Sequence, residues 1–266
     1  MSIITLLTDF GTEDEYVGLM KGVILSINPR AAIVDITHSI GSQDVVQAAL
    51  TIHSSYRYFP AGSVHLIVVD PGVGTERALL ALETRNHVFI APDNGVLTRL
   101  FDEADITSLI RISNADYFLS PVSRTFHGRD IFAPVGAHLT KGVELSKLGP
   151  EMDPHEALRL SNLQARVLKN GEIIGKIIAI DHFGNLISNV ETRQLARHDQ
   201  AGPKSKPKIK IGSHVIHGLS RTYGDVRSNT PMALIGSRGY LEIAVNCGNA
   251  ARKLKARQGD PVRVII

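Results

Sequence analysis

Three carboxylates lie just after short apolar runs, each in a turn that contains glycine. Asp9, Asp70 and Asp93 follow runs that read IITLLT, HLIVV and VFIA. Runs of this length and composition are typical of buried parallel strands, and the ligands of open α/β sheets bind beyond the carboxyl ends of such strands. We therefore expect the three carboxylates to meet at one sheet edge, where they would suit a ligand with hydroxyl groups, amino groups or positive charge.

The first of these turns favours the binding of vicinal hydroxyl groups. Asp9 lies between a predicted strand and a predicted helix, where a carboxylate can accept two hydrogen bonds from the hydroxyls of a ribose. No G-x-G-x-x-G run follows, so the dinucleotide-binding fingerprint is absent. Asp14 lies beside the same helix, and capping of that helix is an equally good interpretation of this residue.

Two further segments carry groups that could move protons. Asp70 and Arg77 flank the turn PGVGTE, whose proline and glycines allow the backbone to approach a ligand. A plain hairpin, with Asp70 capping the turn and Arg77 paired on the surface, is the alternative. His127 precedes a predicted helix and is an acid–base candidate because the pKa of histidine lies near neutrality, although a single histidine is more often structural.

The second half of the chain offers groups that could hold a polar ligand. Asp181 and Asn185 lie where one predicted strand gives way to the next, although both residue types are also common in plain turns. Arg238 lies in the sequence GSRG, where its planar guanidinium could bind a carboxylate or a phosphate.

Residues 1–160 predict an α/β domain. Strand-like and helix-like segments alternate there, which is typical of a mainly parallel sheet with flanking helices. We expect strands at 3–8, 32–36, 63–69 and 88–91, and helices at 15–27, 44–58, 97–102 and 130–141.

Residues 173–266 predict a smaller all-β domain, a barrel or a sandwich. Short β runs alternate there with turns that contain glycine, and we place the domain boundary within 160–172. The expected strands are 173–180, 186–190, 209–211, 214–216, 232–236, 241–245 and 262–266, with a helical segment near 248–255.

Composition excludes several classes of protein. The chain has 266 residues, 43% of them hydrophobic, and a net charge of +3, which is too small to indicate nucleic-acid binding. We interpret the lysine-rich segment 204–210 as a solvated loop. No apolar run reaches the ~18 residues of a membrane span. The start of the chain lacks the basic segment of a signal peptide, and the single cysteine, Cys247, fits a cytoplasmic protein without an internal disulfide.

No metal site is expected. The sequence contains neither a His-Glu-x-x-His motif nor a cysteine pair. Asp35 and His38 could each offer a ligand, but a structural role is the simpler interpretation of both.

Six short motifs, taken together, resemble one protein family. They are TDFGTED at 8–14, VVDPGVGT at 68–75 followed by Arg77, APDNG at 91–95, TFHGRDIFAP at 125–134, IDHFGN at 180–185 and SRGYLEIA at 237–244. In this order, and over nearly the whole chain, they resemble the S-adenosyl-L-methionine (SAM) hydroxide adenosyltransferases, which are related to the SAM-dependent fluorinase and chlorinase.

The resemblance implies an N-terminal α/β domain, a C-terminal β-barrel and a homotrimer. It implies that SAM binds between the N-terminal domain of one subunit and the C-terminal domain of its neighbour. The expected reaction converts SAM and water to adenosine and L-methionine, with no metal and no cofactor.

The resemblance also implies roles for individual residues. A triad of Asp70, Arg77 and His127 would activate water, and the halogen-transferring relatives carry an aromatic residue in place of Asp70, so the resemblance favours water over halide. The residues implied in substrate binding are Asp9 for the ribose, Asp14, Asp181, Ser237 and Arg238 for the methionine amino and carboxylate groups, and Asn185, Phe183 and Tyr223 for the adenine.

Two other functions remain open on the sequence. The chain could be a SAM-dependent halogenase, which would form a 5′-halo-adenosine. It could also be a sensor that binds SAM or adenosine without turnover, although a pure binder would not need a water-activating triad.

Overall fold

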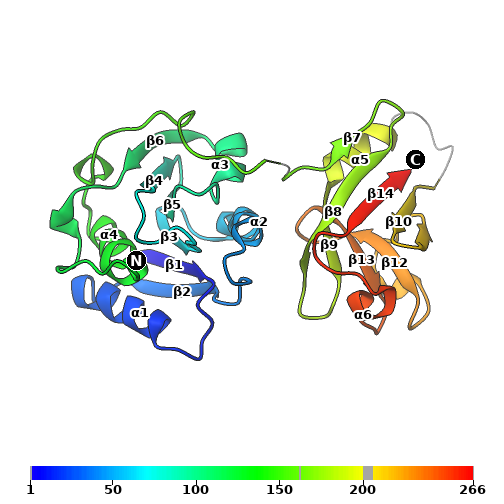
Figure 1. Ribbon diagram of the computed structural model, residues 1–266, viewed down its shortest axis with the longest axis horizontal. Coiled ribbons are helices and arrows are strands. Elements are labelled where there is room, and N and C mark those ends of the chain that lie inside the picture. Colours follow the sequence, from blue (N-terminus) through cyan, green and yellow to red (C-terminus); the bar gives the residue numbers. More distant parts are fainter. Residues whose placement is uncertain (1, 162, 200–205, 266) are drawn as a thin grey trace. The chain divides into compact units, whose positions relative to one another are not determined.

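The computed structural model describes residues 2–161, 163–199 and 206–265, which form two compact units (Figure 1). The units are Met1–Leu160 and Ser161–Ile266. The N-terminal unit is built on a 6-stranded sheet with helices, and the C-terminal unit on an 8-stranded antiparallel sheet. The predicted fold class, α/β followed by a smaller β-barrel, is confirmed.

The N-terminal unit is mainly parallel. Its sheet has the order β2-β1-β3-β5-β4-β6, in which β1, β2, β3 and β5 are parallel, while β4 pairs antiparallel with β5 and β6. The elements are β1 (Ile3–Thr8), α1 (Tyr16–Ile27), β2 (Ala32–Thr37), α2 (Val45–Ser55), β3 (Ser63–Val68), β4 (Leu79–Thr84), β5 (His87–Pro92), α3 (Thr98–Glu103), β6 (Ile106–Arg111), a π-helix (Gly128–Phe132), α4 (Ala133–Thr140) and 3-10 turns at Tyr56–Tyr58, Ala115–Tyr117 and Leu145–Lys147.

The chain changes direction across the sheet between β1 and β3. After β1 it passes through α1 to β2 on one side, and then through α2 to β3 on the other side of β1. Open α/β sheets bind ligands at such a switch point, beyond the carboxyl ends of the strands. Asp9 directly follows β1 and Asp70 follows β3, so both carboxylates lie at this point.

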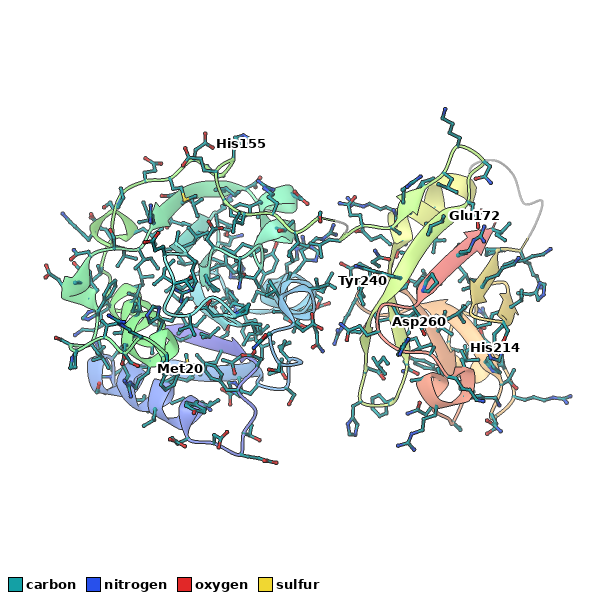
Figure 2. All side chains as sticks on the ribbon, in the orientation of Figure 1. Met20, His155, Glu172, His214, Tyr240 and Asp260 are labelled. Atoms are coloured by element: carbon teal, nitrogen blue, oxygen red, sulfur yellow. The ribbon has the colours of Figure 1, made fainter. Side chains whose placement is uncertain are left out.

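Alternate side chains of the strands enter two different core layers. Leu6 of β1 packs in a cluster with α1 and α4, which contact each other, whereas Leu7 packs with α2 and α3 on the opposite face. Met20 of α1, labelled in Figure 2, is fully buried in the first layer. The apolar character of both faces of the central strands follows from this double cover.

Several elements differ from the sequence expectations. The patterns do not predict β4, β6, β7 or α5. The β4 sequence, LLALET, is rich in residues that favour helices, and its antiparallel pairing with β5 and β6 overrides this preference. The helix expected at 44–58 ends at Ser55 and continues as a 3-10 turn, and the helix expected from residue 130 begins two residues earlier as a π-helix.

The C-terminal unit is a nearly closed antiparallel barrel with the strand order β11-β10-β14-β8-β9-β13-β12. Ser220, just after β11, forms a bridge to Leu234 of β12, so the two ends of the sheet approach each other. Its elements are β7 (Arg166–Val167), β8 (Ile173–Ile180), β9 (Leu186–Glu191), α5 (Thr192–Asp199), β10 (Lys208–Ile211), β11 (His214–His217), a 3-10 turn (Tyr223–Asp225), β12 (Pro231–Ile235), β13 (Tyr240–Val245), α6 (Ala250–Leu254) and β14 (Pro261–Ile265).

The lysine-rich segment is not simply a solvated loop. Lys208 and Lys210 belong to β10 and alternate with Ile209 and Ile211, which are buried in the barrel core. The lysines are therefore the outer face of a strand with period two. The first part of the segment, 204–205, lies outside the described residues.

Two histidines occupy the interior of the N-terminal sheet. Nδ1 of His65, on β3, lies 2.7 Å from Oγ1 of Thr5 on β1, and Nε2 lies 3.2 Å from Nδ1 of His87 on β5. The ring of His65 also stacks on Phe89, with ring centroids 4.9 Å apart. Burial, with a smaller effect of His87, lowers the pKa of His65 from 6.5 to about 3.

We expect this burial to make the protein sensitive to acid. An unfolded chain binds a proton at His65 near pH 6.5, but the folded chain does so only near pH 3. The unfolded state therefore holds more protons in between, and the free energy of unfolding falls as the pH falls through this window, by at most about 1.4 kcal/mol per pH unit for one histidine. Urea unfolding followed by circular dichroism from pH 7 to pH 4 measures this slope.

His65→Phe, which keeps an aromatic ring against Phe89, should have a shallower slope than the wild type even if it is less stable overall. His155→Gln is the control, because His155 is exposed in the same unit (Figure 2). Equal slopes for the wild type and His65→Phe would contradict the assignment.

Candidate active site

A pocket of about 360 Å³ lies at the switch point of the N-terminal sheet. Four segments line it: the turn after β1, the segment before α2, the turn after β3, and the segment that leads into the π-helix. The lining residues are Asp9, Phe10, Tyr16, Ser42, Gln43, Val68, Asp70, Pro71, Val73, Thr125, Phe126, His127 and Gly128.

Arg77 connects Asp70 and His127, two side chains of this pocket that could take or give a proton. Its Nε lies 2.7 Å and 2.9 Å from the two carboxylate oxygens of Asp70, and its Nη2 also contacts this carboxylate. The same Nη2 lies 2.9 Å from Nδ1 of His127. The side chains of Arg77 and Asp70 are only 9% and 5% exposed, so the alternative with Arg77 paired on the surface is wrong.

This contact defines the protonation of His127. An arginine can only donate, so Nδ1 of His127 accepts, and the neutral ring carries its proton on Nε2. Burial of the ring, and then the positive charge of Arg77, lower the pKa of His127 below its ordinary value, against a smaller opposing effect of Asp70. His127 is therefore held neutral, as a hydrogen-bond donor through Nε2.

A glycine allows the turn after β3 to approach the segment before His127. Gly74 has φ +79°, and a Cβ atom there would lie 2.2 Å from the backbone oxygen of Arg124. No other residue type fits this contact without moving the backbone. On the other side of the turn, Nδ2 of Asn94 donates to the backbone oxygen of Val69, at 2.8 Å, and fixes the end of β3.

Asp130 fixes the segment that carries His127. Its side chain is 1% exposed, and Oδ2 accepts from the backbone N–H of Ser123, at 2.8 Å. Nε of Arg129 donates to Oδ1 at 2.6 Å. Asp130, the acidic residue of the HGRD sequence, is therefore structural. It holds in place the backbone segment that carries His127.

Asp9 is oriented by a strained residue. Its Oδ2 accepts from the backbone N–H of Gln43, at 2.8 Å, and Gln43 has φ +62°, which is uncommon for a residue other than glycine. Asp44 caps α2 by accepting from Gln47 N, and Gln47 Oε1 accepts from Gly41 N, so this loop is tied to the helix start. Strain of this kind clusters at functional sites.

Asp14 lies outside this pocket. It is exposed. The N-cap position of α1 belongs to Glu15, not to Asp14, and the side chain of Glu15 makes no capping hydrogen bond. The rings of Phe10, Tyr16 and Phe126 form an apolar wall of the pocket, with centroids 5.1–5.7 Å apart.

The expected meeting of three carboxylates is wrong for Asp93. Asp9 and Asp70 line the pocket, but Asp93 is buried elsewhere, and its Oδ1 accepts from the backbone N–H of Leu158 at 2.8 Å. The APDNG motif therefore supports the fold, since Asp93 ties the chain after α4 to the sheet and Asn94 holds the end of β3.

A second pocket, of about 740 Å³, lies in the C-terminal unit. It contains all the residues predicted for this half of the chain: Asp181, Phe183, Asn185, Tyr223, Ser237 and Arg238. Phe183 and Tyr223 are 74% and 42% exposed, so they offer aromatic surface to a ligand. Ser237 and Arg238 are exposed at the turn between β12 and β13.

Asp181 and Asn185 form a rigid turn. Oδ1 of Asp181 accepts from the backbone N–H groups of Phe183 and Asn185, both at 2.9 Å, and Oδ2 accepts from Nδ2 of Asn185 at 2.9 Å. Gly184 has φ +85° and leaves no room for a Cβ atom, which would lie 2.1 Å from Asn249. The hydrogen bonds confirm the turn interpretation of Asp181 and Asn185, and their role in binding stays a prediction.

Sequence reasoning missed other residues of the two pockets. Gln43 is one, and nothing in its sequence context indicates its positive φ. Glu242, Tyr240 and Cys247 line the C-terminal pocket. A signal for Glu242 existed, because it is the one charged residue of the otherwise apolar strand YLEIAV.

Asp35 and His38 are structural, as expected. Oδ1 of Asp35 lies 3.0 Å from Nε2 of His38, and Nδ1 of His38 lies 2.9 Å from Oγ1 of Thr8. Among the residues that the structure describes, no group of three potential ligands could hold a metal ion. None of the helices in this part of the chain is long and apolar enough to cross a membrane.

Comparisons with known proteins place both units in one family. Residues 4–149 match the SAM hydroxide adenosyltransferase N-terminal domain, and residues 175–263 match the C-terminal domain of the same family. The (R)-S-adenosyl-L-methionine hydrolase of Thermus thermophilus is 36% identical over 100% of both chains. A fluorinase of Actinopolyspora mzabensis is 29% identical and covers 98% of this chain and 96% of its own.

A solved structure agrees with the sequence matches. The crystal structure of an uncharacterized conserved protein from Thermotoga maritima superposes with a TM-score of 0.90, at 35% identity, over 99% of this chain and 100% of that one. With two domain models that together cover most of its length, the chain belongs to the SAM hydroxide adenosyltransferase family.

Proposed function

We propose that this protein hydrolyses SAM to adenosine and L-methionine by attack of water on C5′ of the ribose. The observation that carries the proposal is the hydrogen-bonded set of Asp70, Arg77 and His127 in a pocket that also contains Asp9. Similar proteins named (R)-S-adenosyl-L-methionine hydrolase support the same reaction.

The reaction requires few catalytic groups. Water displaces a neutral thioether from a sulfonium, so the leaving group needs no proton, and one proton is released from the attacking water. An aligned nucleophile and an acceptor for its proton are sufficient. Because the positive charge on sulfur disappears as the C–S bond breaks, an apolar wall such as that of Phe10, Tyr16 and Phe126 favours the transition state over the charged substrate.

The hydrogen bonds suggest how the proton moves. His127 holds its proton on Nε2, so it can donate to the oxygen of water and orient it, but it cannot accept a proton there. The carboxylate of Asp70 is then the acceptor, and Arg77 orients it through both oxygens. We therefore assign Asp70 as the base and His127 as the group that positions the water.

The other predicted residues would bind the substrate. Asp9, with Oδ2 already oriented by Gln43, would accept from the ribose hydroxyls. The methionine end would be held by Asp14, Asp181, Ser237 and Arg238, and the adenine by Asn185, Phe183 and Tyr223. The chemistry needs no metal, cofactor, nucleic acid or membrane, and the single cysteine fits activity in the cytoplasm.

We also propose that the protein works as a homotrimer. The residues for water activation and the ribose lie in the N-terminal unit, whereas those for methionine and adenine lie in the C-terminal unit. A cyclic assembly would build each site from the N-terminal unit of one subunit and the C-terminal unit of its neighbour.

Pure protein incubated with SAM should form adenosine and methionine in equal amounts, identified by mass spectrometry. The names of the similar hydrolases specify the R configuration at sulfur, so the R and S epimers should be tested separately. EDTA should not reduce the rate. Formation of 5′-chloro- or 5′-fluoro-adenosine when halide is added would instead favour the halogenase, and binding without any product would favour the sensor.

Replacing Asp70 with Asn should reduce kcat by about 10²–10⁴-fold, the usual contribution of a general base, because the amide keeps the size but cannot take a proton. His127→Ala should also lower kcat more than it raises the Kd for SAM, measured by calorimetry. Asp9→Ala is the comparison variant, and it should mainly weaken binding. Near wild-type turnover by Asp70→Asn would refute the assignment of the base.

Two inactive variants should complement each other if the sites are shared between subunits. Asp70→Asn lacks the N-terminal half of a site and Arg238→Ala lacks the C-terminal half, so mixed oligomers would contain some sites with both native residues. Activity should return when the two are co-expressed. Mixed oligomers seen by native mass spectrometry, yet no more active than either parent, would mean that each site is built within one chain.

A further inference from the structure

An unassigned carboxylate lies in the wall of the C-terminal pocket. Glu242 is 7% exposed, and its neighbours on β13, Leu241 and Ile243, are fully buried. A glutamate is rarely buried to this extent without a partner of opposite charge or a ligand. Glu242 is not among the residues that line the pocket of Asp70 and His127.

One oxygen of this carboxylate is held in place. Oε1 of Glu242 accepts from the phenol O–H of Tyr223, at 2.6 Å. Tyr223 begins a 3-10 turn that Thr222 and Asp225 close with a capping box, so the phenol is presented from a defined backbone. Tyr223 therefore does more than pack against a base: it orients Glu242.

The other oxygen of the carboxylate lies against Gly236. A Cβ atom at Gly236 would lie 2.5 Å from Oε2 of Glu242. Gly236 begins the turn that carries Ser237 and Arg238, and all three residues line the same pocket as Glu242. Oε2 thus lies close to the turn that presents the guanidinium.

The charges around Glu242 favour a cationic ligand. Burial raises the pKa of Glu242 above its ordinary value, the negative charge of Asp181 raises it further, and Tyr223 and Arg238 act in the opposite sense. Asp181 already accepts three hydrogen bonds within its own turn, which leaves it less capacity for a ligand. A cation bound at Glu242 would stabilise its charged form.

We propose that Glu242, oriented by Tyr223, binds the α-ammonium group of the methionine end of SAM, while Arg238 binds the α-carboxylate. An α-amino acid carries these opposite charges on one carbon, and β13 and its preceding turn offer the complementary pair. The three N–H donors of an ammonium need several acceptors, so Asp181 and Ser237 can contribute beside Glu242. The inference rests on the proposed function, and it gives a binding role to Glu242, a residue of the SRGYLEIA motif without an assigned role.

The test compares SAM with two analogues, one with hydrogen in place of the α-amino group and one with hydrogen in place of the α-carboxylate. The wild type should prefer SAM to each, by kcat/KM. Glu242→Gln should lose about 10–100-fold in kcat/KM for SAM, the usual effect of a charged hydrogen bond, and little for the analogue without the amino group. Arg238→Ala should lose the preference for SAM over the analogue without the carboxylate. It should keep the preference for SAM over the analogue without the amino group.

Two further variants separate binding from folding. Tyr223→Phe should show the same selective loss at smaller size, because Glu242 keeps its charge but not its orientation. Glu172→Gln is the matched control: Glu172 is 8% exposed in the same unit (Figure 2), but it pairs with Arg263, at 2.6 Å, and does not line the pocket. It should leave the preference for SAM unchanged.

Cys247 provides a readout that does not depend on turnover. It is the single cysteine, it is exposed, and it lines the same pocket. In an Asp70→Asn background, SAM should slow the alkylation of Cys247 by iodoacetamide, and Glu242→Gln should need about 10–100-fold more SAM for equal protection.

The failure of this inference and the failure of the proposed function are distinguishable. If Glu242→Gln is folded by circular dichroism and hydrolyses SAM with an undiminished preference over the analogue without the amino group, the ammonium assignment is wrong and the hydrolase stands. If the wild type releases no adenosine, the hydrolase is wrong, and protection of Cys247 by SAM alone, but not by the analogue without the amino group, would still support the ammonium site.

Discussion

One guanidinium group connects the two segments on which the proposed chemistry depends. Arg77 binds both oxygens of Asp70 and, through Nη2, the ring of His127, which lies 50 positions away in the sequence. The contact is possible because the turn after β3 comes close, at Gly74, to the backbone of the segment that precedes His127. A side chain at position 74 would collide with Arg124. Arg77 thereby fixes the orientation of the Asp70 carboxylate and the position of the proton on the His127 ring.

The value of this ion pair lies in orientation more than in stability. Asp70 and Arg77 are both nearly buried, and removing two charges from water costs about as much as their attraction returns, so buried pairs are weak evidence for stability. Fixed dipoles and charges that are already aligned when the substrate arrives do, however, lower the cost of reaching a transition state. In the C-terminal pocket the same logic applies to Glu242, whose burial makes sense if a cation binds there.

The parallel part of the sheet could be predicted because its strands are continuous apolar runs, and Asp9 and Asp70 could be grouped because strand ends meet at one edge. The same rule was wrong for Asp93, since its partner is a backbone N–H on a distant segment that no local pattern reveals. The strands β4 and β6 depend on tertiary pairing in the same way. Glu242 carried a signal, a charge in an apolar strand, but its partners come from two other turns, and only the folded barrel brings them together.

We propose that the N-terminal pocket directs water to C5′ of the ribose. The most direct test is hydrolysis of SAM in water enriched in oxygen-18, with mass analysis of both products. We expect one heavy oxygen in the 5′-hydroxyl of adenosine and none in methionine. Unlabelled adenosine, or label in homoserine released together with 5′-methylthioadenosine, would contradict it, because the oxygen would then come from another source or attack another carbon of the sulfonium.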